Sequence, residues 1–147
     1  MKSMKGQISL EVLITLGVIL AFSLPVLFLM LTVSNYSFES SALQQADATA
    51  GMLADSIEDV YAQGPGAKRM VPLNVPSNTE LISVSDDNVM VRLKVTNGFY
   101  DAVVSISARA KIADGVTLPK GPFVAILEVK ETDDPVTGEK YYEVEVK

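Results

Sequence analysis

The fold of this chain is decided by the stretch Lys5-Gly6-Gln7-Ile8-Ser9-Leu10-Glu11-Val12-Leu13-Ile14, which opens a long apolar run. No charged residue occurs from Val12 to Phe38. About 20 apolar residues cross the hydrocarbon core of a bilayer as a helix, so Val12 to Val33 is predicted to span a membrane. Lysines stand at positions 2 and 5, and the next basic residue is Lys68. The positive-inside bias therefore predicts a cytoplasmic N-terminus, with the rest of the chain outside.

This apolar run differs from an ordinary secretory signal. Such a signal has an apolar stretch of about 7 to 15 residues, followed by a cleavage site with small residues. Here the run is longer, and no such site precedes a clear mature start. One carboxylate, Glu11, also lies at its leading edge, where a membrane charge costs roughly 3 kcal/mol. Glu11 is therefore predicted to have a functional partner.

Gly6, followed by Gln7-x-Ser9-x-Glu11 and an apolar helix, resembles the class III signal peptide of archaeal type IV pilin-like proteins. In that family a prepilin peptidase cuts before the apolar helix, which stays in the mature protein. The resemblance implies cleavage between Gly6 and Gln7, and it implies that Glu11 acts in assembly. The signal motif on this chain is Lys5, Gly6, Gln7, Ser9 and Glu11. The match covers the leader and the apolar helix, whereas the remainder agrees only in general plan.

Composition excludes several classes of function. The chain has no cysteine and no histidine, so disulfides, thiolate sites and the commonest general base and metal ligand are all missing. The net charge is −6, and loss of Lys2 and Lys5 leaves 10 basic against 18 acidic residues, or −8. This balance argues against a nucleic-acid partner. We predict no catalytic residue, no metal and no cofactor.

The 147 residues leave room for one modest domain beyond the apolar helix. We expect a leader over residues 1–6 and an apolar helix for the membrane or filament core over 7–33. An amphipathic helix over 34–63 should pack on a β-rich extracellular head over 64–147. Gly64-Pro65-Gly66 should end the helix. The amphipathic stripe comprises Tyr36, Leu43, Ala46, Ala50, Leu53, Ile57 and Val60.

Two residues mark local features of the apolar helix. Pro25 removes one backbone hydrogen bond and clashes with the carbonyl of Ala21, so a kink or a melted turn is expected there. Gly17 lets another helix approach closely, as small residues do in membranes.

After Gly66 the pattern changes to strands separated by turns. Asp86-Asp87-Asn88, Asn97-Gly98, Asp114-Gly115 and Thr137-Gly138 carry turn residues. We expect an α+β fold in which about five antiparallel strands, as a sheet or a sandwich-like head, cover one face of the long N-terminal helix. The expected strands are 81–85, 89–95, 102–111, 123–130 and 141–146, after an extended lead-in over 70–73.

Three polar segments invite further interpretations. Asp86-Asp87-Asn88 and the segment 133–138 are acidic, but neither has the ligand spacing of an EF-hand, so turn capping is favoured over calcium binding. Asn35-Tyr36-Ser37 is an N-x-S sequon, which makes Asn35 a candidate glycosylation site.

The resemblance implies a structural pilin. It would be made as a membrane precursor and then polymerised with identical subunits into a helical cell-surface filament for adhesion. Its other partners would be the prepilin peptidase and, indirectly, the assembly ATPase with its membrane platform. Two alternatives stay open: a minor pilin that initiates the same filament, and a monomeric signal-anchored extracellular binding domain. A hydrolase is a third and more distant alternative.

Overall fold

The computed structural model describes residues 4–133 and 139–147, and it describes side chains from Ser9 onward. The chain divides into two compact units, one ending at Glu39 and the other running from Ser40 to Lys147. We call the second unit the head, and we call residues 12–38 the apolar segment.

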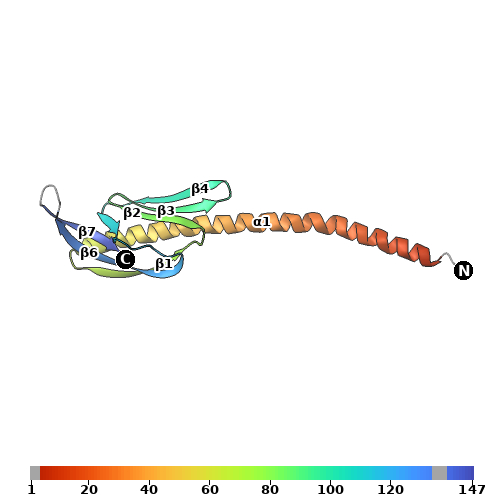
Figure 1. Cartoon of the computed structure of the whole chain (residues 1–147), viewed down its shortest axis with the longest axis horizontal. Helices are drawn as coiled ribbons and strands as arrows, with labels where there is room; N and C mark the ends of the chain where they lie inside the picture. The colour runs from red at the N-terminus through yellow and green to blue at the C-terminus, as the bar shows by residue number, and fades with distance from the viewer. Residues whose placement is uncertain (1–3, 134–138) are drawn as a thin grey trace. The chain divides into compact units, whose positions relative to one another are not determined.

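A single helix, α1 (Met4–Gln63), belongs in part to each unit (Figure 1). It ends where the sequence predicted, because Gly64 takes a φ of 87° that other residues rarely adopt. The amide of Gly64 also donates to the Tyr61 carbonyl at 3.1 Å, which closes the last turn.

The head contains two sheets, labelled in part in Figure 1. The first has the order β1 (Lys68–Val75), β6 (Gly121–Asp133), β7 (Lys140–Val146), β5 (Ala110–Ile112). The second has the order β2 (Thr79–Ser85), β3 (Asn88–Val95), β4 (Gly98–Ser105). All neighbouring strands are antiparallel except β5 and β7, which run parallel. The α+β class is thus confirmed, but the described residues form seven strands rather than about five, and one strand pair is parallel.

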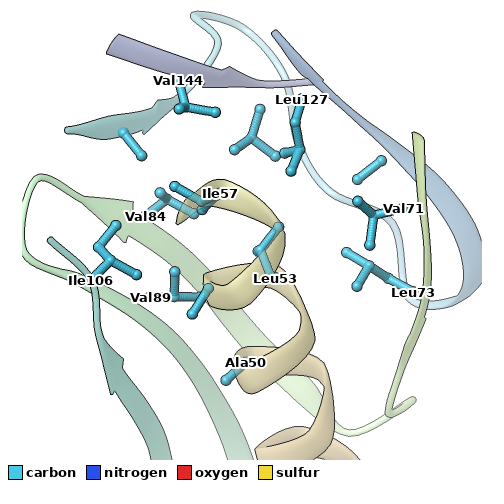
Figure 2. Packing of buried hydrophobic residues seen from close by; sticks show 14 of the residues in the cluster. Ala50, Leu53, Ile57, Val71, Leu73, Val84, Val89, Ile106, Leu127 and Val144 are labelled. Carbon is cyan, nitrogen blue, oxygen red and sulfur yellow. The ribbon is translucent and has the colours of Figure 1, made fainter. Parts of the chain in front are cut away.

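One face of α1 supplies the centre of the core. Ala50, Leu53 and Ile57 are fully buried, and Figure 2 shows them facing side chains of both sheets. The first sheet contributes Val71, Leu73, Leu127 and Val144, and the second contributes Val84 and Val89. The predicted stripe from Leu43 to Val60 therefore packs as core.

The prediction of one strand over residues 102–111 is wrong. Its residues divide between β4 and β5, which belong to different sheets. In the crossing, the amide of Ile106 donates to the Asp87 carbonyl at 2.9 Å, and the amide of Ser107 donates to Glu58 Oε1 at 2.9 Å. Ile106 and Ala108 stay buried, so the alternation of apolar residues continues across the break and imitates one strand.

Two smaller expectations also change. The lead-in over 70–73 lies inside β1, an edge strand, which is where a proline such as Pro72 is tolerated. Tyr36 is 79% exposed and does not belong to the buried stripe.

The predicted turn at Asn97-Gly98 is confirmed by the pairing of Val95 with Gly98. The predicted acidic loop 133–138 and the turn at Thr137-Gly138 lie outside the described residues, except for Asp133, which ends β6.

The position of Leu53 generates a stability prediction. A fragment from Ser40 to Lys147 retains the whole buried core cluster, so we expect it to fold without detergent. Within this fragment, Leu53→Ala should lower the free energy of unfolding by about 2 to 5 kcal/mol, because it leaves a cavity at a fully buried position. Urea titration measures this change.

The matched control is Met52→Ala, one residue earlier on α1 and 47% exposed. It should change the free energy of unfolding by roughly 0.5 kcal/mol or less. Equal effects of the two substitutions would contradict the assignment of the buried helix face.

Candidate assembly segment and head surface

The residues of the predicted signal motif all lie in the first turns of α1. Ser9 and Glu11 have exposed side chains. The side chains of Lys5 and Gln7 lie outside the described residues. The pairing of Glu11 with a new amino group at Gln7 therefore stays a prediction.

The apolar segment exposes about half to three quarters of each large side chain. Between Leu10 and Val33 the large apolar side chains are 48% to 75% exposed. Within the described residues, α1 is the one helix that is long and apolar enough to cross a membrane. An exposed apolar surface of this extent marks a membrane or protein interaction site.

The two threonines in this part of the helix satisfy their hydroxyls locally. Thr15 Oγ1 donates to the Glu11 carbonyl at 2.8 Å, and Thr32 Oγ1 donates to the Phe28 carbonyl at 2.9 Å. Pro25 lies inside α1, and the helix is unbroken there, so the melted turn offered as one alternative at Pro25 is wrong, whereas the kink stays a prediction. Both threonine hydroxyls are thus bonded to the backbone of their own helix. Glu11 is the one charged side chain from Ser9 to Phe38.

The end of the apolar segment carries aromatic and polar residues. Tyr36 and Phe38 are 79% and 76% exposed, and Asn35 of the sequon is also exposed on α1. Aromatic side chains at such a position are typical of a membrane–water interface. Because the side chain of Asn35 is exposed, α1 itself does not block its modification.

The outer face of the first sheet carries a continuous chain of ion pairs. It runs in the order Lys68, Glu128, Lys147, Glu145, Lys130. The pairs of Glu128 with Lys68 and with Lys147 are both 2.9 Å long, and Lys147 lies 3.0 Å from Glu145. Hydrogen bonds from Lys68 and Lys147 lower the pKa of Glu128 to about 2. These charges tie β1, β6 and β7 together across the strands.

The sequence interpretation missed this chain of ion pairs. Its signal is an alternation of charges at i, i+2 spacing, in Glu128-x-Lys130 on β6 and Glu143-x-Glu145 on β7. Such residues point to one face of a sheet, so opposite charges on neighbouring strands are brought together. A strand order was needed to predict which of them meet, and the sequence does not supply it.

The described part of the head includes the following two pockets. The first, of 320 Å³, lies between α1 and β1, where Gln45 Nε2 and Thr49 Oγ1 both donate to the Asn74 carbonyl at 3.0 Å. The second, of 270 Å³, is lined by β2 and by residues 112–120 and includes Glu80 and Lys120. In the turn after β2, Asn88 Nδ2 donates to Asp87 Oδ1 at 3.0 Å. Across the described residues, no three acidic side chains converge as metal ligands would.

The chain matches no protein-family model, no curated protein and no solved structure. Function is therefore argued from the residues and geometry of this chain.

The charge chain on the first sheet predicts an acid-sensitive stability. The pKa of Glu128 is lower in the folded state than its ordinary value of 4.5, so its contribution is complete above pH 4.5 and is lost as the pH falls toward about 2. Lys147→Met removes one of its two cations and should flatten this decline in unfolding free energy. Urea titrations of both proteins across that pH range measure the difference.

Lys94→Met is the matched control, because it removes the same charge from a lysine that has no carboxylate within 4.0 Å among the described residues. It should leave the pH dependence parallel to that of the natural chain. Parallel curves for Lys147→Met would disprove the role of this ion pair.

Proposed function

We propose that this chain is a structural subunit of an archaeal type IV pilus-like surface filament for adhesion. It would be made as a membrane precursor, cut between Gly6 and Gln7, and polymerised through its apolar segment. The observation that carries this proposal is the side-chain exposure of 48% to 75% over the large apolar residues from Leu10 to Val33, next to the single charge of Glu11.

The exposed apolar surface must be shielded from water both before and after assembly. Before assembly lipid shields it, and afterwards neighbouring copies would do so. At ~25 cal/mol per Å² of apolar surface, some twenty large side chains correspond to tens of kcal/mol of gross burial per copy. Leaving lipid forfeits much of this energy, so we expect extraction to need an ATP-driven machine. Heterologous contacts between identical copies would then build an open helical filament.

Glu11 supplies the specificity that apolar packing lacks. Cleavage before Gln7 would create an α-amino group with a reference pKa near 8, which is mostly cationic at neutral pH. Gln7 and Glu11 share a helix face at i, i+4, so a pair within one chain would be geometrically allowed. A pair between copies would also fix the axial register of the filament. We favour the second pairing because only it makes the charge useful in polymerisation.

The first prediction of this proposal concerns processing. Gly6→Phe should leave the precursor uncut, because a peptidase site that admits glycine before the scissile bond excludes a large ring. Intact mass and N-terminal sequencing of membrane and filament fractions measure the start of the chain, which should be Gln7 in the natural protein.

Gly17→Phe is the matched control. A Cβ added at Gly17 meets no atom within 4 Å, and Gly17 lies far from the scissile bond in sequence, so this variant should be cut normally. A natural chain that keeps its first six residues would instead support a monomeric signal-anchored binding domain. A filament in which the correctly cut chain is rare would support a minor pilin.

The second prediction concerns Glu11. Glu11→Ala should be cut normally but give few or no filaments, because breaking a buried pair strands the other charge at a cost of ~3 to 5 kcal/mol. Glu11→Asp should give an intermediate yield, since its carboxylate reaches less far. Electron microscopy of sheared filaments, normalised to the amount of cut chain, measures the yield.

Asp55→Ala serves as the control for the loss of one negative charge. Asp55 is exposed on the head part of α1, and its removal should leave filaments normal. Normal filaments from Glu11→Ala, at equal expression and with Gln7 first, would show that the carboxylate is merely tolerated.

A further inference from the structure

Each sheet of the head has an edge strand at either end of its strand order. These are β1 and β5 in the first sheet, and β2 and β4 in the second. The outer backbone groups of an edge strand can pair with a strand of another chain. Proteins therefore usually protect such an edge by a proline, a bulge, a cover or a short length.

Three of these edge strands carry such a protection. β1 contains Pro72, and its Asn74 carbonyl is occupied by a hydrogen bond of 3.0 Å from Gln45 of α1. β5 has only three residues. β2 has a register shift in its pairing with β3, between Thr79 and Leu81.

β4 has none of these protections. It is eight residues long, contains neither proline nor lysine, and keeps one continuous register with β3 from Gly98 to Ser105. It is the last strand of its sheet (Figure 1), and within the described residues no other strand pairs with its outer side. Two of its apolar side chains, Phe99 and Val103, are 60% and 55% exposed. β4 is thus an open edge strand with an apolar surface.

The hydrogen bonds of the second sheet show which backbone groups of β4 face this open edge. The amide of Ile106, just beyond β4, donates to the Asp87 carbonyl at 2.9 Å, in register with the pairing of β3 and β4. In an antiparallel pair, alternate residues exchange hydrogen bonds with the partner strand. Counting back from Ile106 in steps of two, the even-numbered residues of β4 bond to β3. The amides and carbonyls of Phe99, Asp101 and Val103 therefore face the open edge.

We propose that β4 of one copy pairs antiparallel with β4 of a second copy, centred on Asp101. In this register Phe99 of each copy lies opposite Val103 of the other, and Asp101 lies opposite Asp101. The three pairs provide about six hydrogen bonds between the copies, because each such pair exchanges two. The contact involves the head alone, so it goes beyond the proposed filament function.

The side chains of the open edge fit a second copy because the row is complementary to itself when the strand is reversed. A favourable pair of an aromatic and a β-branched side chain forms twice, from Phe99 and Val103. The two central carboxylates do not meet as free charges. Each Asp101 is held by Arg92 of its own head through two hydrogen bonds of 2.7 and 2.8 Å, which neutralise it.

The symmetry of this contact determines where it can occur. Both copies use the same surface, so the contact is isologous and closes on two copies. Copies that follow one another by a rotation and a rise along one filament are not related by a two-fold axis. In the proposed filaments the contact would therefore join heads of two different filaments.

Cross-linking of the full chain tests the register of the contact. In the proposed register Asn97 lies opposite Ser105 of the second copy, and both residues are exposed. They are roughly 27 Å apart along their own strand, so a short bis-maleimide cannot join them within one copy. The natural chain has no cysteine, so only introduced thiols react. In detergent micelles, where heads can meet in any orientation, Asn97→Cys with Ser105→Cys should give a covalent dimer and no larger product.

Each single cysteine variant is a control for random encounter, because neither residue lies opposite itself in the proposed register. We expect no dimer from either. Equal dimer yields from the single and double variants would overturn the register, and no dimer from the double variant would overturn the contact. A ladder that extends beyond the dimer would show a heterologous contact and would also overturn it.

Two substitutions at Val103, each made in the double cysteine variant, test the backbone pairing itself. Val103→Pro removes an amide that faces the open edge and not β3, which is where an edge strand tolerates proline. Two of the hydrogen bonds between copies are lost, so the dimer yield should fall roughly tenfold or more. Val103→Lys should reduce the yield similarly, because a lysine protects an edge strand from pairing.

Val124→Lys is the matched control, since Val124 is 56% exposed and lies on β6, an inner strand of the first sheet. It should leave the dimer yield unchanged. Urea titration of each variant shows that the head is still folded. Undiminished dimer from folded Val103→Pro and Val103→Lys, or an equal loss from Val124→Lys, would overturn the pairing of β4. The cross-link is measured without filaments, so its outcome is independent of the proposed function.

Discussion

The structure depends on the absence of charge from Val12 to Phe38. A helix of this composition cannot be left in water, since its large side chains from Leu10 to Val33 are 48% to 75% exposed. The absence of charge divides α1 into an exposed apolar part and a part that packs in the core of the head. The apolar segment takes no part in the buried core, because every described member of that cluster comes from Ala42 onward. The head therefore has a core of its own, to which the apolar segment contributes nothing.

The sequence of α1 changes character where that separation occurs. Beyond Ser40 its buried positions begin with small residues, Ala46 and Ala50, and include large residues, Leu53 and Ile57, further along. The small residues let the strands approach the helix, and the large ones fill the space between the two sheets. Hydrogen bonds from Gln45 and Thr49 to Asn74, and from Tyr100 to Asp47, hold the start of this packed part to both sheets.

Much of this arrangement was predictable because it depends on local pattern. The helix end follows from Gly64, the core face follows from the spacing of Leu43 to Val60, and β3 follows from its alternation. The crossing between β4 and β5 was not predictable, since Ile106 and Ala108 keep the period of a strand while the chain changes sheets. The order of the strands, and with it the charge chain through Glu128 and Lys147, depends on pairings between distant residues that no local pattern encodes. For the candidate site the limit is different, because the expected partner of Glu11 belongs to another copy.

The ion pairs of the head belong to the same division of the chain. The head has sixteen acidic and ten basic residues, and seven of the basic side chains pair with carboxylates. Five residues of one ion-pair chain lie on the outer face of the first sheet and connect β1, β6 and β7. All of these contacts lie between Ser40 and Lys147, so the ion pairs that stabilise the head do not depend on what covers the apolar segment.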